Sequence, residues 1–153
     1  MKKEKKEAHS MVSIRSSGPE DLRALAELMG ELGYPTSEEA MSRRMKTMEA
    51  HPSNATFVAE IDGQVAGMIG LRVITGYEYD GRVAYISALV VGSGHRGHGV
   101  GGALLRYGEE WAKRHDAVAV TLTSGIKPER AAAHEFYKRQ GYEINGYRFT
   151  RTL

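Results

Sequence analysis

The segment SALVVGSGHRGHGVGGALL, residues 87–105, combines three patterns in one uninterrupted run. Residues 88–91 are all apolar, which is typical of a buried strand. Six of the chain's 18 glycines follow between residues 92 and 102. Apolar residues at helical spacing come next, at Val100, Leu104, Tyr107 and Trp111. The segment therefore predicts a strand, a glycine-rich loop and a helix in direct succession.

The glycine-rich loop has the composition of an anion-binding site. Glycines let backbone N–H groups turn toward one point, and the start of a helix adds free donors and the positive end of its dipole. A pyrophosphate suits such a site. A P-loop is excluded, because no Gly-Lys-Ser/Thr precedes the helix. The spacing Gly92-x-Gly94-x-x-Gly97 matches a dinucleotide fingerprint by letters. However, it follows antiparallel strands, and no acidic residue stands at a strand end about 20 positions on, which disfavours a nicotinamide cofactor.

The flanking sequence adds further strands and helices. Strands are predicted at 11–15, 56–61, 64–73, 84–91 and 117–123, with one or two more in 142–153. Helices are predicted at 19–32, from a capping box at 36–39 through Met48, at 100–115 and at 128–140. The dipeptides Asp62-Gly63 and Asn145-Gly146 indicate tight hairpins. The methionine stripe at 41, 45 and 48 is interpreted as core packing.

This element order predicts an α/β fold. The strands at 84–91 and 117–123 are joined by a helix, so they should lie parallel with a right-handed crossover, whereas the other strands pair as antiparallel hairpins. The result is a mixed sheet with helices on both faces. Residues 1–10 are expected to form a disordered charged tail, and residues 11–153 a single domain, since 153 residues suffice for one core.

Charge and composition exclude several classes of protein. The formal net charge is +2, and the four lysines and two glutamates of residues 1–9 account for all of it. The rest of the chain is balanced, which argues against nucleic acid as a partner, and truncation of the tail should leave ligand affinity unchanged. The absence of cysteine excludes disulfides and thiolate zinc sites. No apolar run suits a membrane span or a secretion signal, so a cytoplasmic location is expected.

Two motifs give the sequence a family resemblance. Arg96-x-x-Gly99-x-Gly101 and the segment AAAHEFYKRQGY, residues 131–142, resemble the acetyl-CoA binding motif and the fourth-helix motif of the GNAT family of N-acetyltransferases. The resemblance covers residues 11–153. The part from Gln64 onward looks most like the branch that acts on small molecules, such as the aminoalkylphosphonate N-acetyltransferases.

The resemblance implies where acetyl-CoA, the cosubstrate, would bind. In the family the fourth and fifth strands splay apart, and the pantetheine arm lies between them like an added strand. The backbone of Leu89, Val90 and Val91 would bond that arm. The pyrophosphate would be held by Arg96, Gly97, His98, Gly99, Val100, Gly101 and Gly102. Arg96, Arg130 and Lys138 are candidates for contact with the nucleotide 3′-phosphate.

The resemblance also implies catalytic roles. Tyr137 is the candidate general acid, because a phenol can give its proton to the departing thiolate, and it would also contact the cosubstrate. The carboxylate that many members place on the fourth strand as a base is missing here. Glu78 and Asp80, just before that strand, and Ser87 within it are the candidates for draining the amine proton through water.

The acceptor is expected to be a primary amine of a small molecule. Its pocket should lie near the first two helices and the turn at 76–82. Tyr34, Tyr77, Glu78 and Tyr85 are the candidate substrate-binding residues, and aromatic and acidic side chains would suit a cation. A phosphonate-bearing amine would instead need Arg43, Arg44 or Arg82.

Two alternatives remain open. The acceptor could be a protein N-terminus or lysine, or the chain could bind acyl-CoA without turnover. A homodimer is common in the family, but the sequence shows no interface. No metal site is expected, because His95 and His98 lie among mobile glycines and no histidine spacing resembles a metal-binding helix. His134 is interpreted as a packing or capping residue.

Overall fold

The computed structural model describes residues 11–153, so the predicted tail at 1–10 lies outside the described residues. The elements in chain order are β1 (Ser13–Ser16), α1 (Leu22–Leu32), α2 (Glu38–Glu49), β2 (Asn54–Ile61), β3 (Gln64–Ile74), β4 (Arg82–Val91), α3 (Val100–Arg114), β5 (Ala117–Leu122) and α4 (Ala131–Arg139). Short 3-10 turns at Pro19–Asp21, Ser93–His95 and Pro128–Arg130 lie between them.

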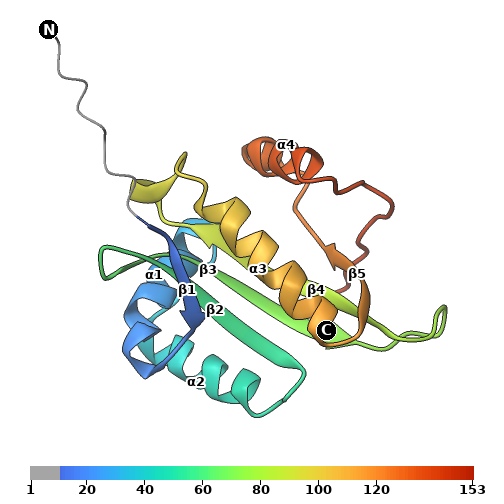
Figure 1. The fold of residues 1–153 in the computed structure, drawn as a ribbon, viewed down its shortest axis with the longest axis horizontal. Coiled ribbons are helices and arrows are strands. Elements are labelled where there is room, and N and C mark those ends of the chain that lie inside the picture. The colour runs from blue at the N-terminus through green and yellow to red at the C-terminus, as the bar shows by residue number, and fades with distance from the viewer. Residues whose placement is uncertain (1–10) are drawn as a thin grey trace, which may run out of the picture.

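The five strands form one sheet in the order β1-β2-β3-β4-β5. Neighbours are antiparallel except β4 and β5, which are parallel and connected through α3. Helix α3 covers one face of this sheet, and α1 with α2 covers the other (Figure 1). The predicted α/β fold, with one parallel pair in a mixed sheet and helices on both faces, is confirmed.

Successive side chains of each strand point to opposite faces of the sheet, so the buried residues form two core clusters, one on each face. On β2, Phe57 belongs to the cluster beneath α3, and its neighbour Val58 belongs to the cluster beneath α1 and α2. The expected core role of the α2 methionines is confirmed for Met41 and Met45, which are buried against α1 and the sheet, whereas Met48 is only half-buried. Helices therefore pack on both faces of the sheet, and β3 is its central strand.

The hairpin between β2 and β3 follows the local sequence signal. Asp62 and Gly63 have φ angles of 50° and 74°. Positive φ at both central residues is the requirement of a type I′ turn, which is why Asp-Gly suits it. The predicted helix end at Gly33 is likewise confirmed, because its φ is 109° in the left-handed region.

Two predictions about local structure are wrong. Thr36 does not cap α2: the cap is Ser37, whose Oγ accepts from the Ala40 N–H at 3.1 Å, while the Thr36 hydroxyl donates to the Tyr34 carbonyl at 2.7 Å. Adjacent Thr and Ser both suit a cap, and the pattern does not separate them.

The second error concerns the end of the chain. The structure assigns no strand and no hairpin to residues 142–153 in the part of the chain that it describes. The Asn145-Gly146 signal favours a turn but does not supply a neighbouring strand, and without one the alternating residues remain unpaired.

Candidate active site

The parallel strands β4 and β5 pair over only half of β4. Their register runs from Arg82 opposite Ala117 to Ile86 opposite Leu122. Beyond that point β4 continues to Val91, whereas β5 has ended. The second half of β4 therefore presents backbone N–H and C=O groups on a side where the described residues supply no strand partner.

A β-bulge marks the point where the strands part. On β3, Leu71 is opposite Ile86 and Gly70 is opposite Ala88, so Ser87 is an extra residue without a partner. The Ser87 side chain is exposed. Bulges bend a strand and redirect a side chain, and they occur often beside active sites. The sequence pattern did not reveal this bulge, because it depends on the register with β3.

The glycine loop ends in a helix N-terminus with free donors. Gly97 and Gly99 have φ angles of 79° and 77°, a conformation that side chains with a Cβ rarely adopt. Gly99 precedes α3 and supplies no side-chain cap, and the first bonded amide is that of Ala103, which donates to the Gly99 carbonyl at 3.1 Å. The N–H groups of residues 100–102 thus have no partner within the helix and suit an anion.

Three contacts hold the beginning of this loop. The Gly92 N–H donates to the Ala66 carbonyl at 2.7 Å. The Ser93 N–H donates to both carboxylate oxygens of Glu31, at 3.1 and 3.2 Å. The Arg96 Nε donates to the Val91 carbonyl at 3.4 Å. Glu31 was missed by the sequence analysis, because its partner lies 62 residues away and no local pattern links the two.

Helix α4 meets α3 and β4 near this loop. A Cβ on Gly101 would lie 3.5 Å from both the Phe136 ring and the Val91 side chain, so the three elements converge there. Tyr137 follows Phe136, and their ring centroids are 5.3 Å apart. Burial raises the pKa of Tyr137 above its ordinary value, and the charge of Arg130 opposes that rise. The phenol is therefore protonated at neutral pH.

Side-chain contacts anchor α4 from within the helix and from just beyond its end. His134 lies one turn before Tyr137, and its Nε2 is 2.7 Å from the Gly125 carbonyl, so a proton on Nε2 joins α4 to the loop after β5. Beyond the helix, the Tyr142 hydroxyl donates to Glu109 on α3 at 3.3 Å. These contacts fix the helix that carries Tyr137.

Ser124 is a second residue that the sequence analysis missed. It lies two residues beyond the end of β5, and its hydroxyl is buried without a hydrogen-bond partner among the described residues. A buried unpaired hydroxyl is costly and commonly indicates a missing partner. The second half of β4, the start of α3 and this hydroxyl thus all carry polar groups that lack a partner of their own kind among the described residues.

The structure does not bring every candidate residue to this site. Tyr77, Glu78 and Asp80 lie on the exposed connection between β3 and β4, at the opposite end of β4 from the glycine loop. At a strand rise of about 3.3 Å per residue, Arg82 and Ser87 are already roughly 17 Å apart. A direct contact between this connection and Tyr137 is absent from the described residues, so these roles stay predictions.

The other two acceptor candidates have structural neighbours of their own. Tyr85 on β4 lies beneath the guanidinium of Arg72, whose Cζ is 4.8 Å from the ring centroid. Tyr34 is exposed between α1 and α2. Of the cationic candidates, Arg44 donates to the Thr36 hydroxyl at 3.2 Å. Their roles in acceptor binding stay predictions as well.

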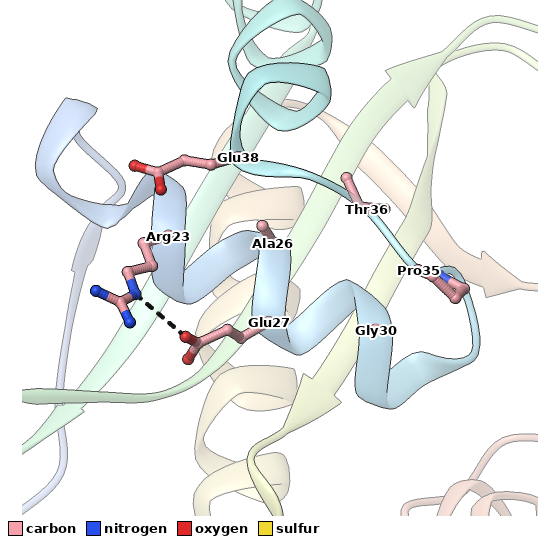
Figure 2. Close-up of a pocket in the computed structure, with 7 residues that line it drawn as sticks. All are labelled: Arg23, Ala26, Glu27, Gly30, Pro35, Thr36 and Glu38. Atoms are coloured by element: carbon pink, nitrogen blue, oxygen red, sulfur yellow. Dashed lines mark hydrogen bonds and ion pairs between the residues drawn. The ribbon is translucent and has the colours of Figure 1, made fainter.

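Two open clefts lie outside the candidate site. The first, of about 400 Å³, lies along α1 and the segment that leads to α2 (Figure 2). Arg23 and Glu27 in it form an ion pair at 3.4 Å, so their charges cancel. The second, of about 670 Å³, adjoins the beginning of β4 and includes Arg82 and His115. Neither is lined by the glycine loop or by α4.

Residues 11–153 bring no three His, Asp or Glu side chains into an arrangement that could hold a metal ion. Within the same residues, no helix has the length and apolar character needed to cross a membrane.

Comparisons with known proteins agree with this geometry. Residues 22–142 match the family model described as Acetyltransferase (GNAT) family. An aminoalkylphosphonate N-acetyltransferase of Salmonella typhimurium is 32% identical over 126 residues, which is 82% of this chain and 78% of that protein.

Solved structures share the fold. A GNAT family acetyltransferase of Staphylococcus aureus superposes with a TM-score of 0.78 at 29% identity, covering 93% of this chain and 98% of that one. An aminoglycoside N-acetyltransferase solved in complex with CoA has a TM-score of 0.80 at 18% identity, covering 94% and 95% of the two chains.

Proposed function

The chain belongs to the acetyltransferase (GNAT) family and is an acyltransferase, and we propose that it transfers the acetyl group of acetyl-CoA directly to a primary amine of a small molecule. One observation carries this proposal. The unpaired half of β4 leads straight into the glycine loop and the free N–H groups at the start of α3. A ligand with an amide-containing arm and a pyrophosphate matches this order of groups.

The proposed cosubstrate contacts follow the chain. Leu89, Val90 and Val91 offer backbone groups on the free edge of β4, where an extended arm can bind as a strand does. The N–H groups from Arg96 to Gly102 face the pyrophosphate, helped by the dipole of a 15-residue helix. The buried hydroxyl of Ser124 gains a polar partner from the arm.

The proposed chemistry needs one positioned acid. The neutral amine nitrogen attacks the thioester carbonyl carbon, the carbon–sulfur bond breaks, and the sulfur leaves as a thiolate. Tyr137 gives its phenolic proton to that thiolate and regains a proton from solvent. Burial makes the phenol less acidic, but the same apolar surroundings also make the thiolate more basic, so the transfer remains feasible.

Proton loss from the amine takes a different route. The described part of β4 has no acidic residue. The bulge presents Ser87 to solvent at the point where β4 and β5 part. We propose that the Ser87 hydroxyl binds a chain of water molecules that carries the amine proton away. Glu78 and Asp80 would accept that proton only through further water molecules. Water is a weak base and takes little of the proton from a strongly basic ammonium group. Acceptors whose amines have a low pKa, and are already neutral at pH 7, should therefore react fastest.

The acceptor class follows from the relative in Salmonella typhimurium, which is described as acting on aminoalkylphosphonates. A phosphonate would require cationic partners, and Arg43, Arg44 and Arg82 are the proposed ones. Tyr34, Tyr77 and Tyr85 would contact the rest of an amine acceptor. The arginines predict a preference for phosphonate-bearing amines over polyamines of the same length.

The test measures free thiol released from acetyl-CoA with a panel of aminoalkylphosphonates, polyamines, aminoglycosides and lysine-containing peptides. Release with small amines, together with the acetylated product by mass spectrometry, supports the proposal. Release with peptides alone would mean a protein acetyltransferase. Acetyl-CoA binding without release for any acceptor would mean a binding module.

A further inference from the structure

Four polar side chains form a strip on the sheet face opposite α3. We call Arg72, Tyr85, Ser87 and Thr121 the polar strip. Leu71 and Val73 belong to the core cluster beneath α3, so Arg72 between them points to the other face. The same alternation places Tyr85 of β4 and Thr121 of β5 on that face. Arg72 and Thr121 are exposed and Tyr85 is half-buried, whereas further along the sheet α1 and α2 cover this face.

Ser87 ends the polar strip at the point where β4 and β5 part. Gly70 precedes Arg72 by two residues on β3 and therefore faces the same side. A Cβ on Gly70 would lie 3.9 Å from the Ser87 Cβ, which places Ser87 on this face as well. At about 3.3 Å per residue, Ser87 lies roughly 7 Å along β4 from Tyr85. The strip thus leads from Arg72 to the bulge.

Arg72 carries the single charge of the polar strip, and an aromatic ring holds it in place. Its Cζ is 4.8 Å from the ring centroid of Tyr85, its cross-strand neighbour. Apart from this contact, Arg72 forms no ion pair and donates no hydrogen bond among residues 11–153. A guanidinium held against a ring keeps its N–H groups for an anion, and its planar fork matches the oxygens of a phosphonate. The strip therefore offers a positioned positive charge and no negative one.

The proposed place of acetyl-CoA puts its reactive end beside this strip. The pyrophosphate is assigned to the loop that follows Val91, and the pantetheine arm to Leu89, Val90 and Val91. The thioester at the far end of that arm then points back along β4 toward Ser87. An acceptor whose amine reaches the thioester from the face opposite α3 passes over Tyr85 and Arg72.

We propose that Arg72, positioned by Tyr85, binds the anionic group of the acceptor and so selects amines that carry a phosphonate a short alkyl chain away from the nitrogen. This inference rests on the proposed function and deepens it. With its phosphonate on Arg72, such an acceptor extends toward Ser87 and presents its amine there. A polyamine would instead place a second cation against Arg72, and like charges repel. Arg72 thus adds a cation to the three proposed above, and it is the one held beside the bulge.

A titration of aminoethylphosphonate into the ¹⁵N-labelled full chain tests the proposal without turnover. It is carried out with and without CoA, which has no acetyl group to transfer. We expect saturable binding, with amide shift changes at residues 70–72 and 85–87. Arg72→Gln should raise the Kd at least about tenfold, because a hydrogen-bonded charge is lost. Arg72→Lys keeps the charge without the planar fork, so its Kd should lie between those of the wild type and Arg72→Gln.

Arg23→Ala is the matched control for the loss of an exposed arginine. Its side chain on α1 is 82% exposed and lies outside the polar strip, so the Kd should stay within about twofold of the wild-type value. Because Arg72 is exposed too, its variants should keep the thermal melt of the wild type.

Two substitutions at Tyr85 test its positioning role. Tyr85→Leu removes the ring and should raise the Kd for aminoethylphosphonate about two- to fivefold, since a cation–π contact at an exposed site is lost. Tyr85→Phe keeps the ring face and should give a Kd closer to that of the wild type. Equal losses in both variants would mean that the Tyr85 hydroxyl, and not its ring, is what matters, and would contradict this role.

Charge reversal tests selection between acceptors. In the thiol-release assay, Arg72→Glu should lower kcat/KM for aminoethylphosphonate and raise it for a diamine of the same length. An unchanged Kd in Arg72→Gln, no binding of aminoethylphosphonate to the wild type, or shift changes only outside the polar strip would each overturn the proposal. Binding that depends on Arg72, without acetyl transfer to any amine, would contradict the proposed function and leave the assignment of Arg72 standing.

Discussion

At the residue scale, the proposed catalysis depends on a phenol that is held by its neighbours. Tyr137 lies between Phe136 and Tyr142, with ring centroids 5.3 and 5.9 Å away. His134 and Tyr142 connect its helix to the loop after β5 and to α3. These contacts hold the Tyr137 hydroxyl in a fixed position. Removing that hydroxyl should therefore affect only the proposed proton transfer.

Tyr137→Phe should lower kcat by about 10²-fold or more, because general acid catalysis contributes that much. The affinity for acetyl-CoA should stay within about twofold, since only a hydroxyl is lost. Burial raises the pKa of Tyr137 above about 10, so its donor form persists below that pH and only a decline in kcat at higher pH can belong to it. The measurement is kcat against pH for both enzymes.

Tyr107→Phe on α3 is the control for the loss of a tyrosine hydroxyl and should leave kcat unchanged. An unchanged kcat in Tyr137→Phe at every pH would remove Tyr137 from the mechanism.

Glu31 should affect the affinity for acetyl-CoA, because its carboxylate accepts from the Ser93 N–H and so orders the glycine loop. Glu31→Ala frees the Ser93 N–H and should raise the Kd for acetyl-CoA about three- to tenfold, because a hydrogen bond to a charged group is lost. Glu31→Gln keeps a hydrogen-bond acceptor, so its Kd for acetyl-CoA should lie between those of the wild type and Glu31→Ala. Glu27→Ala, one turn earlier on α1, is the matched control in calorimetric titration. Equal affinities for Glu31→Ala and the control would show that the contact does not order the loop.

At the element scale, the first strand depends on one ion-pair network. Arg15 on β1 donates to both oxygens of Asp21, at 2.7 and 2.9 Å, and to Glu60 on β2 at 2.8 Å. Asp21 is only 3% exposed and also accepts from the Gly18 N–H. The network joins β1, the turn before α1, and β2, so it closes one edge of the sheet.

Asp21→Asn should lower the free energy of unfolding by about 1–2 kcal/mol at pH 7, after allowance for the partly exposed arginine. The hydrogen bond from Arg15 lowers the pKa of Asp21. The stabilisation is therefore complete above the unfolded value of about 3.9 and is lost as pH falls through the lower folded value. Chemical denaturation from pH 7 to pH 2 should show the difference between wild type and variant shrinking in acid.

Glu20→Gln is the control for that series, since Glu20 is largely exposed and lies 3.7 Å from Arg15. Its effect should stay below about 0.5 kcal/mol. A difference between wild type and Asp21→Asn that is constant with pH would contradict the role of charge.

The elements also show what local sequence can predict. The Asp62-Gly63 hairpin and the strand, loop and helix around residues 87–105 follow from signals within a few residues, and the structure has them where expected. The Ser87 bulge depends on register with β3, and the Glu31 contact on a residue far along the chain, so neither has a local signal. The same reason explains the missing C-terminal strands, since an alternating pattern cannot supply its own neighbour.

At the scale of the whole molecule, the two faces of the sheet differ in their proposed roles. Helix α3 and the glycine loop, with α4 beside them, form the proposed cosubstrate side. Helices α1 and α2 pack on the other face, and Glu31 in the last turn of α1 reaches across to the loop. The β4 strand contributes Ala84 and Ile86 to one core cluster and Val90 to the other, so the candidate site is built on a strand that both cores hold in place.

The most direct test of the central claim is a titration of the ¹⁵N-labelled full chain with acetyl-CoA, followed by amide chemical shifts. We predict saturable binding at tens of micromolar or below, with the largest changes at residues 89–91 and 96–102 and smaller ones on α4. Absence of saturable binding in that range would contradict the proposal, and so would changes confined to the clefts beside α1 or at the beginning of β4.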